Sequence, residues 1–139
     1  MKKILVFTAI VFIFFNCTGN KKEKVIQNDS KVSLRTDTLN VVKLTDTLVI
    51  FESTCRGCAY ESSTAFAIKD SLDIIKLSDV ETSDNNSSDM AGGSISKNLI
   101  LVPVKTGSTI LKMYKFWNGV PSNMNDSLPF TSYTIEIQN

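Results

Sequence analysis

The sequence predicts an all-β fold, an antiparallel β-sandwich or barrel of about seven short strands. Through most of the chain after residue 37, apolar and polar residues alternate with a period of two, as in strands that bury one face. These segments are rich in β-branched and aromatic residues, and Gly, Pro, Asn, Asp and Ser lie between them, where turns are expected. No stretch shows a sustained helical pattern of apolar residues.

Seven segments carry this alternation, and we expect each to form a strand. They are TLNVVKL (38–44), TLVIF (47–51), TAFAIKD (64–70), LDIIKL (72–77), NLILVPVK (98–105), STILKMYKFW (108–117) and SYTIEIQ (132–138). Residues 71–80 come closest to a helix, but they fit a strand and a turn equally well. Three intervening stretches, 53–60, 84–94 and 115–129, are candidate functional loops, because long loops in a small domain often carry function.

The first residues resemble an export signal. A positive start, Met1-Lys2-Lys3, leads into an apolar run over residues 4–15 and then to Cys17. This run has the length of a signal-peptide h-region and is too short to span a bilayer as a helix. An h-region that ends on a cysteine resembles the lipoprotein signals of Bacteroidetes-type bacteria, in which the cysteine is acylated, as with palmitate, and becomes the first residue. The alternative is an ordinary secretory signal that is cut near Cys17.

The chain therefore divides into three expected parts. Residues 1–16 are the lipoprotein signal peptide, residues 17–33 a lipidated flexible tether, and residues 34–139 the β-sandwich domain. We expect an exported protein that is held by lipid on a bacterial membrane, at the periplasmic face or the cell surface. Without the signal peptide, thirteen basic and fourteen acidic residues remain, and this balance does not indicate a nucleic-acid partner.

Cys55 and Cys58 lie three residues apart in the first candidate loop, and three kinds of site have this spacing. A thioredoxin-like redox centre needs its first cysteine at a helix N-terminus, but the residues that follow are β-rich. A zinc site needs four ligands, and the sequence contains no histidine. A disulfide fits best, because a turn at Arg56-Gly57 brings the two Cα atoms within bridging range. Lipidation of Cys17 also leaves these two cysteines as a pair.

The composition also bears on catalysis and metal binding. Without histidine, neither a Ser-His-Asp nor a Cys-His arrangement is possible. Redox chemistry at Cys55 and Cys58 is the remaining enzymatic alternative. The acidic and amide residues of 84–89 follow no known calcium-loop pattern. We therefore expect no enzyme, no cofactor and no metal site.

The stretch VVKLTDTLVIFESTCRGCAY, residues 41–60, resembles the start of the chagasin-like inhibitors of papain-type cysteine proteases. In that family a strand with a Gly-Asp turn leads into a loop with the motif Asn-Pro-Thr-Thr-Gly. Thr45-Asp46 stands at the turn, and residues 53–57, Ser-Thr-Cys-Arg-Gly, stand on the loop. Cys58 and Tyr60 stand at its aromatic positions, while the Asn-Pro-Thr-Thr core itself is absent.

The second and third motifs of the family have counterparts further along the chain. Gly92-Gly93-Ser94 is similar to its Gly-x-Gly-Gly loop, and Lys115-Phe116-Trp117 stands in for its Arg-Pro-Trp motif. The resemblance covers residues 41–137 and rests on the order and spacing of the elements. Gly57, Gly92, Gly93 and Trp117 are the positions closest to motif identity.

The resemblance implies an immunoglobulin-like sandwich that binds a papain-like cysteine protease through three loops at one end. The residues expected to contact the partner are Thr54, Arg56, Gly57, Gly92, Gly93, Lys115, Phe116 and Trp117. Trp117 is the expected aromatic anchor, since interface hot spots favour tryptophan. The alternative, from a different class, is a structural or assembly lipoprotein of the cell envelope with no inhibitory activity.

Replacement of Cys17 tests the export prediction. The Cys17→Ser chain should lose its partitioning into the detergent phase of a two-phase extraction, because it lacks the acylated residue. The double variant Cys55→Ser/Cys58→Ser is the matched control and should partition like the parent. Continued membrane association of Cys17→Ser would mean that the anchor lies elsewhere in the chain.

Overall fold

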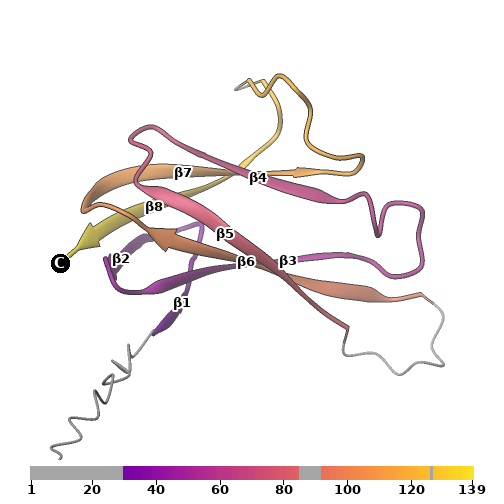
Figure 1. The fold of residues 1–139 in the computed structure, drawn as a ribbon, viewed down its shortest axis with the longest axis horizontal. Helices are drawn as coiled ribbons and strands as arrows, with labels where there is room; N and C mark the ends of the chain where they lie inside the picture. Colours follow the sequence, from indigo (N-terminus) through magenta and orange to yellow (C-terminus); the bar gives the residue numbers. More distant parts are fainter. Residues whose placement is uncertain (1–29, 85–91, 126) are drawn as a thin grey trace, which may run out of the picture.

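The computed structural model describes residues 30–84, 92–125 and 127–139, which form eight strands and no helix. The strands are β1 (Lys31–Ser33), β2 (Leu39–Lys43), β3 (Thr47–Cys55), β4 (Ala65–Asp70), β5 (Ile75–Ser83), β6 (Ser94–Pro103), β7 (Gly107–Phe116) and β8 (Thr131–Gln138). They form two four-stranded sheets that pack face to face, so the predicted all-β sandwich is confirmed, with eight strands instead of about seven (Figure 1). Among these residues there is no helix that is long and apolar enough to cross a membrane.

Sheet A has the strand order β1-β3-β6-β5, and sheet B has the order β2-β8-β7-β4. Most strand pairs are antiparallel, as predicted, but β1 runs parallel to β3 and β2 runs parallel to β8. The chain changes sheet and reverses direction both between β1 and β2 and between β2 and β3. Two reversals bring β3 back into the sheet of β1 in the same direction, with β2 acting as the crossover.

The sandwich begins earlier than expected. Residues 31–33, which the sequence places in the tether, form β1 and pair with residues 47–49 of β3. The backbone N–H of Leu34 extends this pairing by donating to the carbonyl of Val49 at 2.9 Å. The rest of the expected signal peptide and tether, with Cys17, lies outside the described residues. All described strand pairing is made within residues 31–138, so a chain without residues 1–17 keeps the whole sandwich.

Residues 71–80, which fit either a helix or a strand and turn, belong to a loop and to β5. Their strand is longer than expected and reaches Ser83, with a β-bulge between Leu77 and Asp79. A bulge twists an edge strand locally and disturbs its pattern of backbone groups. It also interrupts the alternation, which explains why the sequence pattern was ambiguous in this segment.

The core lies between the two sheets and is built by the alternation along each strand. Six inward side chains are less than 2% exposed, four from sheet A and two from sheet B: Leu48, Ile50, Leu99, Leu101, Leu111 and Ile135. The side chain of Asn40 is also buried, and it is satisfied by backbone partners. It accepts from the N–H of Arg35 at 2.9 Å and donates to the carbonyl of Thr134 at 3.0 Å. Asn40 therefore fixes the β1–β2 connection against β8.

Asp46 organises the turn between β2 and β3. Its carboxylate accepts the N–H of Lys43 at 2.7 Å and the hydroxyl of Ser30, and its own N–H donates to the Lys43 carbonyl at 3.0 Å. The hydrogen bond from Ser30, followed by that from the Lys43 backbone, lowers the pKa of Asp46 below its ordinary value. Both bonds favour the ionised form. The carboxylate thus ties the first described residue to the turn.

The turn should make part of the stability depend on pH. Asp46→Asn should lower the free energy of unfolding at pH 7 by about 2 kcal/mol, because it removes a charged acceptor of two hydrogen bonds. Since folding lowers the pKa, this contribution is fully present above the unfolded value of about 3.9 and disappears as the pH falls through the folded value. Urea unfolding at several pH values measures it.

The same substitution at an exposed loop aspartate, Asp73→Asn, is the control and should change stability little. A difference between the parent and Asp46→Asn that stays constant down to pH 2 would contradict this account of the turn.

Candidate functional site

The three candidate loops leave their strands at one end of the sandwich, on the right in Figure 1, and the β7–β8 loop then rises to the top of the view. They connect β3 to β4, β5 to β6, and β7 to β8. The N–H of Arg56 donates to the carbonyl of Gly93 at 3.0 Å, which joins the first loop to the second. The hydroxyl of Ser63 donates to the carbonyl of Trp117 at 2.6 Å, and the N–H of Gly119 donates to the Ser63 carbonyl at 2.9 Å. The first loop therefore lies between the other two and bonds to both.

The β3–β4 loop is closed by a disulfide between Cys55, the last residue of β3, and Cys58. Their Cα atoms lie 5.8 Å apart, within the range that disulfides require. Gly57 between them has a φ of +71°, a conformation that glycine adopts without strain. Its N–H donates to the carboxylate of Glu61, and the Glu61 N–H donates to the Cys58 carbonyl at 3.1 Å. The loop is thus held by its own bonds.

The surroundings of the disulfide differ from those of a redox centre. Thioredoxin-like enzymes activate a thiol at a helix N-terminus, and the part of the chain that the structure describes contains no helix. The described residues also contain no group of three or more Cys, Asp or Glu side chains that would hold a metal ion. The geometry supports a structural bridge that fixes the shape of a loop.

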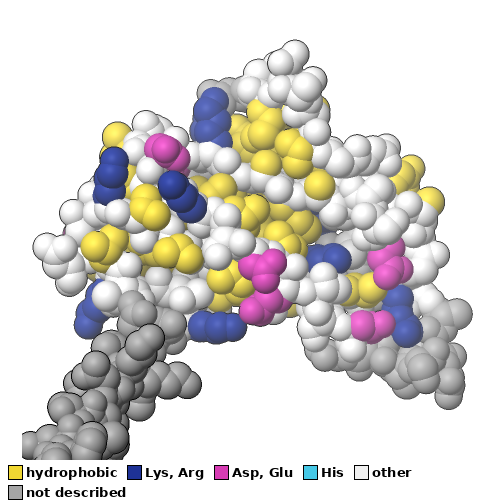
Figure 2. Space-filling model, viewed as in Figure 1, with side chains coloured by type: hydrophobic (Ala, Val, Ile, Leu, Met, Phe, Trp, Pro, Cys, Tyr) yellow, Lys and Arg dark blue, Asp and Glu magenta, His cyan; other side chains and the backbone are white. Residues whose placement is uncertain are grey.

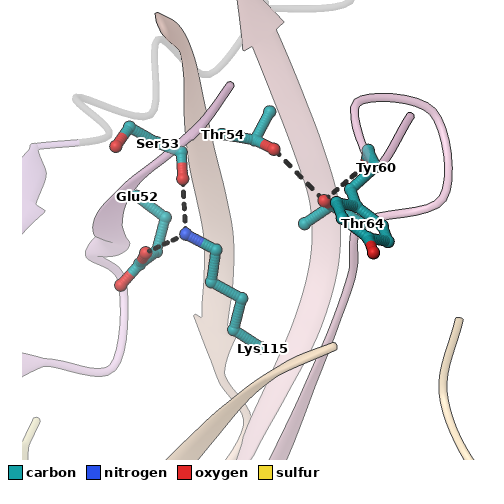
Figure 3. Close-up of polar contacts among 6 residues, drawn as sticks. All are labelled: Glu52, Ser53, Thr54, Tyr60, Thr64 and Lys115. Atoms are coloured by element: carbon teal, nitrogen blue, oxygen red, sulfur yellow. Dashed lines mark hydrogen bonds and ion pairs between the residues drawn. The ribbon is translucent and has the colours of Figure 1, made fainter. Parts of the chain in front are cut away.

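Thr54 and Lys115, both expected to contact a partner, are used inside the domain (Figure 3). Thr54 is 3% exposed, and its hydroxyl lies 3.1 Å from the hydroxyl of Thr64 at the other end of the loop. The Thr64 hydroxyl in turn lies 2.6 Å from the carbonyl of Tyr60, to which it donates. Because alternation along β3 turns Thr54 inward, its side chain is not presented at the loop surface.

The ammonium group of Lys115 links the two sheets at this end. It lies 3.2 Å from a carboxylate oxygen of Glu52 on β3 and donates to the carbonyl of Ser53 (Figure 3). It also lies 5.2 Å from the ring centroid of Trp117, as in a cation–π contact. The side chains of Glu52 and Lys115 are each about three-quarters buried, so Lys115 stabilises the site from the inner face of the sheet. Its bond to Ser53 also gives that carbonyl a donor at the open edge of β3.

Arg56 and the glycine pair connect the first two loops. The guanidinium of Arg56 lies 2.8 Å from the carboxylate of Asp84, and its side chain is 18% exposed. Gly92 and Gly93 have φ values of +81° and +95° and are exposed. Their left-handed backbone returns the chain to β6 and presents the Gly93 carbonyl to Arg56. Arg56 is therefore a tie between loops and is not directed into solvent.

Trp117 and Tyr60 form the exposed part of the site. They are 50% and 47% exposed, and their ring centroids lie 5.8 Å apart with the planes tilted by 59°. With Cys55 and Asn118 they line an open depression of about 510 Å³. Tyr60 and Asn118 were not among the expected contact residues. Tyr60 was recognisable as an aromatic two residues after Cys58, whereas nothing in the sequence marked Asn118.

Phe116 points away from this depression, because alternation along β7 puts it on the opposite face from Lys115. Its ring stacks on Tyr114 at a centroid distance of 6.2 Å. Tyr114 is fully buried on the outer face of sheet B, where Phe130 also packs on it at 5.8 Å. Of the eight expected contact residues, the loops thus bring Gly57, Gly92, Gly93 and Trp117 to the exposed surface of one end.

Two solved structures have a similar arrangement of strands. One is the cysteine protease inhibitor EhICP2 from Entamoeba histolytica, with a TM-score of 0.52 and 19% identity over 78% of this chain and 95% of the inhibitor. The other is amebosin, with a TM-score of 0.52 and 10% identity over 78% of this chain and 97% of that protein. The chain has the immunoglobulin-like β-sandwich fold of these two proteins.

This immunoglobulin-like fold is the one that the sequence resemblance implied. The matches cover nearly the whole of both solved structures, so they include all layers of the sandwich. No family model matches the sequence, and no curated protein sequence matches it. At these identities the likeness concerns the fold, and the activity has to be argued from the site.

The link between Glu52 and Lys115 should contribute measurably to stability. In a double-mutant cycle with Glu52→Gln and Lys115→Met, the coupling free energy should be about 1 kcal/mol, since both side chains are mostly buried. The exposed pair Lys31 and Glu81, 3.7 Å apart, is the matched control, and its Lys31→Met and Glu81→Gln cycle should give nearly zero. Equal coupling in the two cycles would show that the link has no special role.

Proposed function

We propose that this chain is an exported, lipid-anchored inhibitor of papain-type cysteine proteases that binds its target through the loop end of the sandwich. The observation that carries the proposal is the junction of the disulfide-closed β3–β4 loop with Trp117 at one end of an inhibitor fold. The resemblance of the three loop segments to the inhibitor motifs supports the same end as the contact surface.

A rigid central loop favours inhibition over cleavage. A papain-type protease cuts a segment that lies extended in its cleft, whereas residues 56–64 are closed by the disulfide and by hydrogen bonds within the loop. A loop that is already ordered loses little entropy on binding. The exposed backbone at Gly57 would then cover the catalytic cysteine of the protease without adopting a scissile conformation.

Trp117 and Tyr60 supply the apolar contact beside this loop. Aromatic side chains that are half exposed before binding bury much of their remaining surface in a partner, and interface energy is concentrated in a few such residues. Arg56 and Lys115 contribute indirectly, because the first holds the β5–β6 loop through Asp84 and the second lies against the Trp117 ring. The site therefore consists of a few exposed contact residues on loops that ion pairs and ring contacts within the domain hold in place.

Titration of the chain from residue 18 onward against papain-type proteases tests the proposal. Trp117→Ala should raise the inhibition constant roughly thirtyfold, which corresponds to ~2 kcal/mol for a truncated anchor. Phe51→Ala is the matched aromatic control, because Phe51 is 65% exposed on β3 and lies outside the loop end, and it should leave inhibition unchanged.

Two further results bear on the same experiment. Reduction of the disulfide, or Cys55→Ser/Cys58→Ser, should weaken inhibition and allow cleavage within residues 56–64. The parent chain from residue 18 should show no reactive thiol. If no papain-type protease is inhibited by the folded chain, the proposed function is wrong and an envelope-assembly role becomes the better interpretation.

A further inference from the structure

Strand β3 has one edge that its neighbours cover only in part. On one side, β6 pairs with β3 from Leu48 to Cys55, whereas on the other side β1 pairs with residues 47–49 alone. The N–H of Leu34 adds a last bond to the carbonyl of Val49. Beyond Val49, no strand among the described residues pairs with this edge, and β3 continues past β1 toward the loop end (Figure 1).

The alternation of backbone groups along β3 identifies the residues that face the open edge. The N–H of Thr47 and the carbonyl of Val49 both bond on the side of β1, so the odd-numbered residues direct their backbone groups to that edge. Phe51 and Ser53 follow in the same phase. The Ser53 carbonyl already accepts a hydrogen bond from the ammonium group of Lys115. The carbonyl of Phe51 and the N–H of Ser53 are therefore the groups that an added strand would meet.

The sandwich is hollowed beside this edge. A depression of about 430 Å³ is lined by the β1–β2 connection, residues 34–38, and by Phe51 and Tyr133. Glu52, the next residue of β3, lines a second depression of about 310 Å³. Sheet B is open here as well, because the pairing of β2 with β8 leaves residues 131–133 beyond its end. This side of the sandwich thus has an opening between the uncovered edges of β3 and β8.

The charges near the opening are compensated, and its most exposed side chain is apolar. Phe51 is 65% exposed, more than any other large apolar side chain that the structure describes. Glu52 is paired with Lys115 at 3.2 Å, and Arg35 and Asp37 at the rim carry opposite charges. Figure 2 shows basic and acidic side chains close together at the loop end as well. Binding at this edge therefore depends on backbone groups and apolar surface and not on charge.

We propose that the open edge of β3 binds an extended segment of another protein, which adds a strand beside residues 51–55 and in line with β1. Backbone donors and acceptors at the spacing of a strand are the pattern that an extended polypeptide matches. Side chains on one face of the added strand enter the opening beside Tyr133, and those on the other face lie against Phe51. The segment that fits is uncharged and apolar at alternate positions. This contact lies on the side of the sandwich and is independent of protease inhibition at the loop end.

Two other occupants fit this edge less well. In a dimer that joins Phe51 of each copy to Ser53 of the other, the end of each β3 would meet β1 of its partner. A dimer centred on Ser53 would use its carbonyl, to which the Lys115 ammonium group is already bonded. The chain's own N-terminal segment enters at Ser30, at the end of β1 remote from the open edge. A segment of another protein has none of these restrictions.

A nuclear magnetic resonance titration tests the contact with the chain from residue 18 onward, which keeps the whole sandwich. The probe is a capped peptide of alternating valine and threonine, a strongly strand-forming sequence. It should bind and slow the exchange of the Ser53 amide hydrogen with solvent, because that group gains an acceptor. The amides of Glu52 and Thr54 face β6 and should change little. The same peptide with proline at both central positions loses a donor on each edge and should bind roughly tenfold more weakly.

Two substitutions test the protein side of the contact. Ser53→Pro removes the donor at the open edge and keeps the bonds to β6, and it should lower peptide affinity roughly tenfold. Phe51→Ala should lower it about fivefold, because it removes the exposed ring, and should leave protease inhibition unchanged. Ile110→Ala, at a side chain 54% exposed on the other sheet, is the matched control and should bind the peptide like the parent. Equal denaturation midpoints establish that the variants are folded.

Several results would overturn the proposal. These are no binding of the peptide at millimolar concentration, binding that is indifferent to proline in the peptide and to both edge substitutions, and amide changes confined to the loop end. A dimer that Phe51→Ala abolishes, in a chain that binds no peptide, would make a second copy the occupant. A Ser53 amide that is protected in the free chain and loses this protection when residues 18–29 are removed would make the N-terminal segment the occupant.

Discussion

Two sheets press their apolar faces together, and this contact removes the side chains of Leu48, Leu99, Leu111 and Ile135 from water almost completely. Burial of that kind is the largest favourable contribution to folding. It also fixes the course of the chain, since strands aligned with the contact leave their connections at the two ends. A charged side chain that points inward is costly to bury unless it has a partner of opposite charge. Glu52 and Lys115 point inward near one end of the sandwich, and there they form an ion pair. The rigid support beneath the loops is a direct result of this constraint.

Most of the fold could be predicted from the sequence, because alternation records which face of a strand is buried. The parallel direction of β1 and β2 could not, since direction depends on crossings between sheets and not on side-chain pattern. In the site, hydrogen bonds join the loops that carry Gly57, Gly93 and Trp117, the three loops that the motif order singled out. Thr54 and Lys115 were assigned to the surface because their partners, Thr64 and Glu52, are identified by strand register and not by any local signal.

The described charges at the loop end are paired within the domain. At the loop end, Arg56 and Lys115 each have an acidic partner, so that neither adds a free positive field to the contact surface. The proposed contact with a protein therefore rests on shape and aromatic side chains and not on net charge.

The parallel pairing of β1 with β3 has a mechanical consequence. A chain that is anchored through its N-terminus and held by a partner at the loops is pulled along the direction of its strands. Such a load acts on β1 in shear, so the bonds that join residues 31–33 to residues 47–49 resist it together, and Leu34 and Ser30 add a bond at each end. An antiparallel hairpin pulled from its open end would instead lose its bonds one at a time. With the proposed anchor and partner, β1, the shortest of the described strands, would carry this load in shear.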